Sequence, residues 1–399
     1  VKDFICDVIR YWVKDFDVDG IRLDAADVMD FEYMKALRTV ANEVKADFWL
    51  MGEVIHGDYI RWANADTLHS VTNYHLHKAL YSGYNDHNFF EIAHTVKRLN
   101  DMCSGVFKLY SFVDNHDVER IMSKLSTPKG FVPVHILLYT LPGVPSIYYG
   151  SEFGIEGKKG HGADADVAIR PEMVYEDWTS AMEENAYVKF ITALGNMRHQ
   201  VKALSYGDYQ EQNLTTRQYT FSRSYEGSTV VVMVNNDDNA CTMHGGAPDG
   251  TYKGVLSGRT ITVSGGGFSA EIAGNLGEIW VPETTDGKFE PTDVVVEETP
   301  VEVLVQETVK VETPVVEESV LEEVVETAQE QEEAIVEEVE TEEKVLDLNK
   351  PYEEMSIEEL QASILAKMAK NGPVTDDMKR TVTVNTHQGS LLNWVKSFN

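Results

Sequence analysis

Apolar and polar positions in the first 200 residues alternate between two patterns, helical spacing and short apolar runs. Residues 2–15, for example, carry apolar side chains on one helical face, and a short apolar run at 20–25 follows. This alternation predicts βαβ units, an α/β fold with a parallel sheet covered by helices. The expected helices are 2–15, 31–45, 89–102, 131–141 and 184–200, and the expected strands are 20–25, 48–52, 68–72, 107–113 and 145–149.

The pattern changes after residue 200. A closed (β/α)8 TIM barrel needs eight strands, so residues 1–200, with five, correspond to part of one. Residues 201–283 contain short β-branched or aromatic segments separated by Gly, Asn and Asp turns, which is typical of an antiparallel β-sandwich. The strands expected there are 217–223, 229–235, 251–256, 259–263 and 276–281.

Charge sets apart a third region. The chain carries a formal charge of −32, and residues 283–347 hold 23 acidic residues against three lysines. We expect residues 284–347 to form a disordered acidic linker, because this composition buries too little apolar surface to offset chain entropy. A docking tail for a basic partner is the alternative interpretation. So acidic a chain disfavours binding to nucleic acid or to anionic membranes.

The last segment, 348–399, is predicted to be a small helical module. Ser356 and Glu359 have capping-box spacing, an apolar stripe follows, and Asn371-Gly372-Pro373 ends the helix. The stripe is expected to pack on its own neighbours, with a partner helix as the alternative. No run of about 18 apolar residues is present to span a bilayer.

Several kinds of site are excluded by motif. Cys6, Cys103 and Cys241 are too widely spaced for a disulfide framework or a zinc site. A GxSxG nucleophile elbow and the glycine motifs of nucleotide-binding folds are absent. The SGGG run from Ser264 to Gly267 follows a sandwich strand and is predicted to be a turn.

Polar side chains follow four of the predicted strands, where reactive groups of α/β folds lie. The segments are DGIRLDAAD (19–27), MGEVIHG (51–57), FVDNHD (112–117) and LPGVPSIYYGSEFG (141–154). Three carboxylates, Asp24, Glu53 and Asp117, are therefore expected on one rim. Each alone could be a strand-end cap or an ion pair, such as Arg22 with Asp24. Together they favour a site, and paired carboxylates suit glycoside hydrolysis.

These motifs together resemble the α-amylase family of glycoside hydrolases, which has a (β/α)8 barrel followed by a C-terminal β-sandwich. DGIRLDAAD resembles the strand-four motif of the family, GEVIHG the strand-five motif and FVDNHD the strand-seven motif. PGVPSIYYGSEFG resembles the segment at strand eight. The resemblance covers about residues 1–283 and places residues 1–200 at about strands 4–8.

The resemblance implies a role for each matching side chain. Asp24 matches the nucleophile, Glu53 the general acid/base and Asp117 the carboxylate that stabilises the transition state. The negative charge of the two aspartates would help Glu53 to keep its proton. The substrate-binding positions implied are Arg22, which orients the nucleophile, His116, which binds sugar hydroxyls, Asn115, which supports that loop, and His56.

His56 also narrows the range of expected substrates. The cyclomaltodextrinase and neopullulanase group carries a His at this place, so the motif here resembles the motif of that group. The function implied is a retaining hydrolase that cleaves α-1,4-glucosidic bonds of maltodextrins, cyclodextrins or starch fragments through a covalent glycosyl-enzyme intermediate. An α-glucosidase or glucanotransferase of the same family, and a non-catalytic amylase-like binding protein, are the alternatives.

The strand-three motif of the family has no counterpart, so we expect the first three βα units to lie before Val1. Calcium is the one cofactor that the resemblance suggests, and its ligands are not identifiable in this chain. The expected partner is an α-glucan oligosaccharide, with oligomer formation left open. Asp27 and Val28 differ from the Lys-His that many α-amylases carry after the nucleophile motif, so short maltodextrins are the preferred substrates. These substrates and the lack of disulfides favour the cytoplasm.

Overall fold

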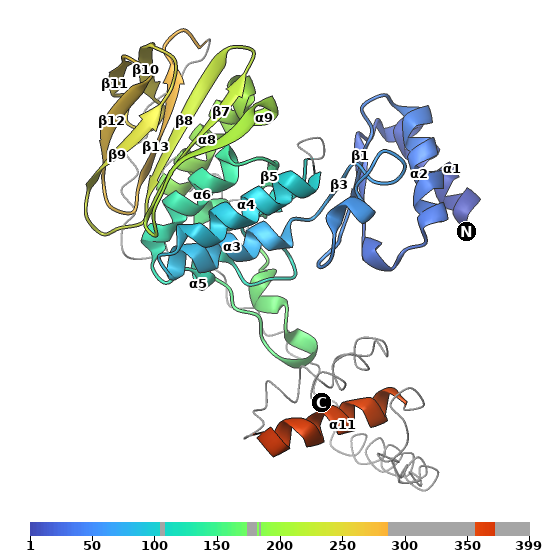
Figure 1. Cartoon of the computed structure of the whole chain (residues 1–399). Coiled ribbons are helices and arrows are strands. Elements are labelled where there is room, and N and C mark those ends of the chain that lie inside the picture. The colour runs from blue at the N-terminus through green and yellow to red at the C-terminus, as the bar shows by residue number, and fades with distance from the viewer. Residues whose placement is uncertain (104–107, 174–181, 183–184, 286–355, 372–399) are drawn as a thin grey trace, which may run out of the picture. The chain divides into compact units, whose positions relative to one another are not determined.

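In the computed structural model, which describes residues 1–103, 108–173, 182, 185–285 and 356–371, five short parallel strands follow one another in chain order. Figure 1 labels β1, β3 and β5 among them. β1 pairs with β2 and β2 with β3, a bridge joins Thr72 to Tyr110, and β4 pairs with β5. The predicted α/β alternation and the parallel pairing are confirmed. The strands are β1 (Gly20–Leu23), β2 (Trp49–Gly52), β3 (Ser70–Val71), β4 (Tyr110–Phe112) and β5 (Val144–Ser146), each shorter than expected.

Helices separate these strands, and side-chain caps begin several of them. Asp30 accepts a hydrogen bond from the Tyr33 amide at 2.9 Å, and Asn73 accepts one from the Leu76 amide at 3.1 Å. All five helices expected in residues 1–200 are present, as α1 (Lys2–Phe16), α2 (Phe31–Val44), α4 (Phe89–Cys103), α6 (Phe131–Thr140) and α8 (Ala186–Gln200). The structure adds α3 (Tyr74–Asn85), α5 (Ile121–Lys124) and α9 (Lys202–Tyr206).

The sequence analysis missed α3 because its inner face is not purely apolar. His77 and Tyr84 are buried on that face beside Leu76 and Leu80, so the apolar spacing is incomplete. The short helices α5 and α9 were also missed. Each has too few turns to show a helical period.

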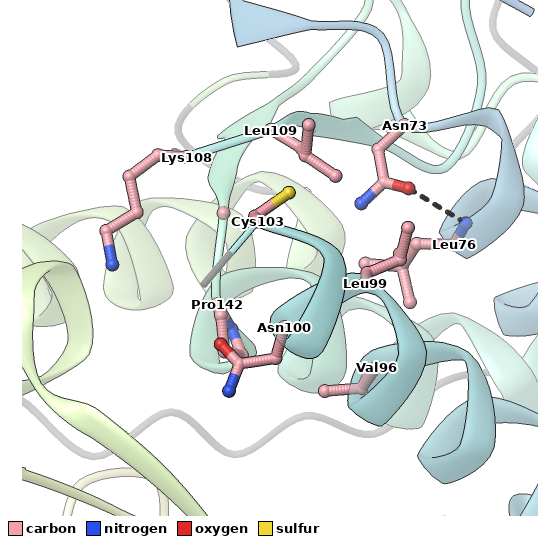
Figure 2. A pocket seen from close by; sticks show the side chains of 10 residues that line it. Asn73, Leu76, Val96, Leu99, Asn100, Cys103, Lys108, Leu109 and Pro142 are labelled. Carbon is pink, nitrogen blue, oxygen red and sulfur yellow. Dashed lines mark hydrogen bonds between the residues drawn. The ribbon is translucent and has the colours of Figure 1, made fainter. Parts of the chain in front are cut away.

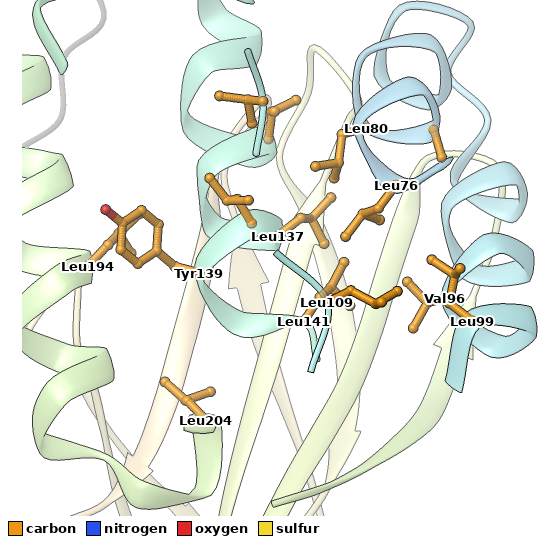
Figure 3. Packing of buried hydrophobic residues seen from close by; sticks show 14 of the residues in the cluster. Leu76, Leu80, Val96, Leu99, Leu109, Leu137, Tyr139, Leu141, Leu194 and Leu204 are labelled. Atoms are coloured by element: carbon orange, nitrogen blue, oxygen red, sulfur yellow. The ribbon is translucent and has the colours of Figure 1, made fainter. Parts of the chain in front are cut away.

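α6 forms the centre of the core. All ten of its residues are buried, and Leu137 lies close to Leu76 and Leu80 of α3 (Figure 3). The same core continues into the antiparallel region through side chains such as Val232 and Ile279. The helices and the antiparallel strands therefore share one hydrophobic core.

The antiparallel region contains a six-stranded sheet, β11-β10-β13-β8-β7-β6, and a two-stranded sheet, β12-β9. Alternate residues of β8 point to two cores, with Val232 packing towards the helices and Met233 between the sheets. The predicted sandwich is confirmed. The strands are β6 (Asp208–Leu214), β7 (Gln218–Tyr225), β8 (Ser228–Asn235), β9 (Cys241–Gly246), β10 (Gly250–Gly254), β11 (Thr260–Val263), β12 (Gly267–Ile272) and β13 (Gly277–Pro282).

The sequence analysis missed β6, β9 and β12, whose exposed residues are polar or charged apart from Gly267. Antiparallel pairing stabilises them, β6 with β7 and β9 with β12. The expected turn at Ser264–Gly267 is confirmed. Gly265 and Gly266 have φ of 67° and 78°, which favour glycine, and Ser264 bridges to Gly267.

The chain is divided into two compact units, residues 1–308 and residues 309–399. Most of the predicted acidic linker (284–347) lies outside the described residues, as does most of the predicted module (348–399). In the second unit, α11 (Ile357–Asn371) has the bounds expected from its sequence signals, and Leu360 and Ile364 are buried.

Two arginines bind the carboxyl end of α6, the half-buried Arg198 and the buried Arg223. Arg198 of α8 donates to the Tyr139 carbonyl, and Arg223 of β7 donates to the Thr140 carbonyl at 2.7 Å. Arg223 Nη2 also donates to the Gly207 carbonyl at 2.9 Å. Burial and the nearby Arg198 lower the pKa of Arg223 to about 9. Arg223 thus satisfies helix-end carbonyls across the boundary between helices and sandwich.

We predict that Arg223→Met lowers the free energy of unfolding by roughly 1–3 kcal/mol, because two buried carbonyls lose a donor that water cannot replace. Chemical denaturation measures the change. Arg217→Met is the control, since its side chain is 38% exposed, and a change within about 0.5 kcal/mol is expected there. Equal stability of the two variants would contradict the role given to Arg223.

Candidate active site

Arg22 brings two of the expected carboxylates together. Its Nη1 lies 2.7 Å from Asp24 Oδ1, and its Nη2 lies 2.9 Å from Glu53 Oε2. Arg22 and Asp24 lie on one face at the end of β1, whereas Glu53 directly follows β2. The Glu53 side chain is 12% exposed and that of Asp24 is 80% exposed. One carboxyl group is thus sheltered and the other is open to solvent.

The parallel pairing of β1 and β2 continues into this site. Glu53 donates its amide to the Leu23 carbonyl, and Ala26 donates its amide to the Glu53 carbonyl, each at 2.9 Å. Ala25 has a left-handed φ of 44°, which is unfavourable for alanine, and its amide donates to Glu53 Oε2 at 3.3 Å. The backbone turn after Asp24 therefore points a donor at the neighbouring carboxylate.

Gly52 allows this close approach. A Cβ at this position would lie 2.7 Å from the Ala26 Cβ and would also overlap the Leu68 side chain. Any larger residue would force β2 away from the turn after β1. The absence of a side chain at residue 52 therefore keeps Glu53 beside Asp24.

Tyr74 connects this pair to the loop after β4. Its hydroxyl donates to Glu53 Oε1 at 3.3 Å and accepts from Asn115 Nδ2 at 3.1 Å. Asn115 Oδ1 accepts from the amides of Asp117 and Val118 at 2.8 and 3.1 Å. The Asn115 side chain thus stabilises the turn of its own loop and joins that loop to Tyr74.

Asp117 pairs with basic side chains. Its Oδ2 lies 3.0 Å from His116 Nε2, and its Oδ1 lies 2.8 Å from Arg170 Nη2. Arg170 also contacts Asp166 at 2.7 Å and donates its Nε to the His116 carbonyl at 2.7 Å. Asp117 and His116 are each about two-fifths exposed, so their free edges remain open to a ligand.

Burial changes the ionisation of two groups beneath this rim. It raises the pKa of Tyr74 to about 12, with the negative charges of Glu53 and Asp117 adding to the effect. His77 stacks on Phe112 at 5.1 Å and bonds to the Val113 carbonyl at 2.8 Å. Burial lowers the pKa of His77 to about 4. Tyr74 therefore remains a hydrogen-bond donor, and His77 stays neutral, at neutral pH.

His56 is exposed and lies close enough to His75 to act on it electrostatically. Within the part of the chain that the structure describes, no hydrogen bond joins it to Asp24, Glu53 or Asp117. The sequence analysis missed Tyr74 and Arg170. Tyr74 lies three residues after β3, so the rule applied to strand ends could have found it, whereas Arg170 lies in irregular structure with no such signal.

A separate hollow lies away from this rim, lined by α3, α4 and the residues before β4 and β5 (Figure 2). Leu76, Leu99 and Cys103 line it with Lys108 at its edge, so its wall is largely apolar.

Among the described residues, no group of three or more His, Cys, Asp or Glu could hold a metal ion.

Residues 1–205 match the family model of the alpha amylase catalytic domain. A cyclomaltodextrinase of Thermoanaerobacter pseudethanolicus is 27% identical over 241 residues, which cover 59% of this chain and 40% of that protein. An intracellular maltogenic amylase of Bacillus subtilis is 26% identical over 243 residues, with the same two shares. The chain thus spans about 40% of the length of these curated relatives.

Solved structures agree with the fold. An Anoxybacillus alpha-amylase superposes with a TM-score of 0.62 at 23% identity, covering 71% of this chain and 63% of that one. An alpha-amylase of Geobacillus thermoleovorans, solved with acarbose, superposes with a TM-score of 0.60 at 21% identity, covering 71% of this chain and 64% of that one.

Over the described residues, no helix has the length and hydropathy that a membrane span requires.

We predict that acid destabilises the protein through His77. Its pKa of about 4 in the folded state lies below the ordinary 6.5, so the unfolded chain binds the proton first as the pH falls. Stability is therefore complete above about pH 6.5 and declines towards pH 4, by up to ~1.4 kcal/mol per pH unit. The buried His135, whose pKa burial also lowers to about 4, adds to the decline.

Denaturant unfolding of His77→Phe at several pH values tests this prediction. The phenyl ring preserves the stacking on Phe112 but cannot titrate, so the decline with acid should become shallower. His244→Phe is the control, because His244 is exposed on β9. A decline in His77→Phe as steep as that of the wild type would show that His77 is not responsible.

Proposed function

Because this chain belongs to the alpha-amylase family, as the match of its residues 1–205 to the catalytic domain shows, we propose that it cleaves α-1,4-glucosidic bonds. The substrates are maltodextrins, cyclodextrins or starch fragments. One observation carries the proposal: a single guanidinium, Arg22, contacts Asp24 and Glu53 at 2.7 and 2.9 Å. Retaining glycosidases need two carboxyl groups about 5–5.5 Å apart, a separation compatible with binding to one guanidinium.

In the proposed reaction, an Asp24 carboxylate oxygen attacks the anomeric carbon while Glu53 gives its proton to the departing glycosidic oxygen. The carbon–oxygen bond to the leaving sugar breaks as the bond to Asp24 forms. Glu53, now ionised, then takes a proton from water, and the resulting hydroxide displaces Asp24. Two inversions at the attacked anomeric carbon leave it in the α-configuration, and both carboxyl groups return to their starting states.

The exposure of the two carboxyl groups supports this division of roles. Asp24 is paired with Arg22 and open to solvent, so it suits a nucleophile that must be ionised and accessible. Glu53 is sheltered and accepts hydrogen bonds from Tyr74 and the Ala25 amide as well as from Arg22. When sugar displaces Arg22 from Glu53, the remaining contacts keep the carboxyl group directed at the cleft.

Asp117 and His116 are assigned to the sugar at the cleavage point. The Asp117 carboxylate can accept hydrogen bonds from ring hydroxyls and oppose the positive charge of the oxocarbenium-like transition state. Arg170 neutralises Asp117 in the free protein at 2.8 Å. We infer that sugar hydroxyls replace part of this contact on binding.

Glucosyl transfer is the second candidate function. A cyclomaltodextrin glucanotransferase of a Bacillus species is 27% identical over 287 residues, or 68% of this chain and 38% of that protein. Hydrolysis and transfer use the same carboxylates and differ in whether water or a sugar hydroxyl attacks the intermediate. Incubation with maltotriose separates them, since products longer than the substrate indicate transfer and shorter ones alone indicate hydrolysis.

We predict that Asp24→Asn lowers kcat on maltotriose by about 10³-fold or more, because the amide keeps the shape of the side chain but cannot attack carbon. Thermal unfolding should change little, as this side chain is 80% exposed. Asp27→Asn, also on the exposed turn after β1, is the matched control and should keep its activity. Turnover of Asp24→Asn close to that of the wild type would refute the assignment.

A different pattern is expected for Glu53→Gln. Substrates with an activated aryl leaving group need no protonation, so their turnover to the covalent intermediate should fall far less than that of maltotriose, for which a loss of about 10²–10⁴-fold is expected. Burst kinetics with a 4-nitrophenyl α-maltoside measure the first step. Equal losses on both substrates would count against Glu53 as the acid.

A further inference from the structure

The loop carrying Asn115, His116 and Asp117 is held at both ends by buried charged side chains to which the proposed reaction gives no role. Asp114 precedes these residues and is 1% exposed, and Arg120 follows them and is 0% exposed. Both side chains reach the segment after β5. The two ends of the loop are therefore fastened to the same neighbouring segment.

Ser151 joins the two charges. Its hydroxyl lies 2.7 Å from each carboxylate oxygen of Asp114 and 3.3 Å from Arg120 Nη1. Arg120 Nη1 also donates to the Tyr149 carbonyl at 2.6 Å, and Asp114 accepts from the Ile121 amide at 2.8 Å. Separated by one hydroxyl, the opposite charges compensate each other in a site without water access.

Arg120 also contacts aromatic rings at the rim. Its guanidinium carbon lies 4.2 Å from the ring centre of Tyr148 and 5.0 Å from that of Tyr149. Nε and Nη2 of Arg120 lack a hydrogen-bond partner among the described residues, so these rings are what faces them. The ring of Tyr148 in turn lies 6.5 Å from that of His116. The buried Arg120 therefore contacts the rings of Tyr148 and Tyr149 and lies at the end of the loop that carries His116.

We propose that Arg120 is a positioning residue, which acts with Asp114 through Ser151 to hold His116, Asp117 and the ring of Tyr148 in their relative places. The part of this proposal that concerns turnover rests on the proposed function of His116 and Asp117. Without the guanidinium, Asp114 loses its countercharge and Tyr148 loses its support. A displacement of about 1 Å at such groups can lower the rate by ~10²-fold.

The kinetic test uses Arg120→Met in the whole chain with maltotriose. We expect kcat to fall about 10–100-fold and KM to change less than about 3-fold, because Asp117 interacts most strongly with the transition state. Arg120→Lys keeps the charge and the ring contact and should recover part of kcat. In Asp114→Asn/Arg120→Met the loss should be smaller than the product of the single losses.

Arg223→Met is the matched control, because Arg223 is equally buried and donates to backbone carbonyls away from the rim. It should lower stability without lowering kcat. A kcat of Arg120→Met equal to that of the wild type would overturn the proposal, and so would kcat losses that track melting temperature equally in both variants. Ser151→Ala, which removes the bridge alone, provides the same comparison if Arg120→Met does not fold.

A second readout does not depend on turnover. In protein labelled with ¹³C-histidine, the His116 signal, identified by its loss in His116→Gln, should shift in Arg120→Met and stay in place in Arg223→Met. An unchanged His116 signal would refute the positioning role. If the signal shifts but the wild type cleaves no α-glucan, the proposed function fails while the positioning role stands.

Discussion

The hydrogen-bonded register between β1 and β2 is the constraint on which the candidate site depends. It continues past both strand ends, through the Glu53 amide to the Leu23 carbonyl and the Ala26 amide to the Glu53 carbonyl. This places Glu53 beside the turn that follows Asp24, where one arginine reaches both carboxylates. A slip of one residue would reverse the face on which each side chain lies and separate them.

Such a concentration of charge needs compensation, and the fold supplies it in two ways. At the open rim, Arg22 and Arg170 pair with the acidic groups and stay exposed enough to yield to a ligand. Beneath the rim, groups are buried in neutral or compensated form, such as the uncharged His77 and the Asp114–Ser151–Arg120 cluster. We propose that the exposed pairs exchange for sugar hydroxyls, whereas the buried groups hold the loops in place.

The sandwich contributes to the core of the fold although it lies outside the site. It shares one hydrophobic core with α6, and Arg223 from β7 satisfies the carbonyl end of that helix. α6 leads directly to β5, and the segment after β5 supplies Ser151 and the tyrosines that contact Arg120. Packing at the sandwich thus stabilises α6 and the core beneath the rim.

The sequence by itself determined the alternation of helices and strands, the parallel order of the five strands and the positions of Arg22, Asp24, Glu53 and Asp117 at strand ends. These features are local, because hydrophobic period and strand-end position are recorded in short segments of the chain. Only the tertiary structure decided that Arg22 also contacts Glu53, that Tyr74 joins Glu53 to Asn115, and that Arg170 and Arg120 support the loop of Asp117. These side-chain contacts join residues far apart in the chain, such as Asp117 and Arg170, which are separated by 53 positions, and no local pattern encodes such contacts.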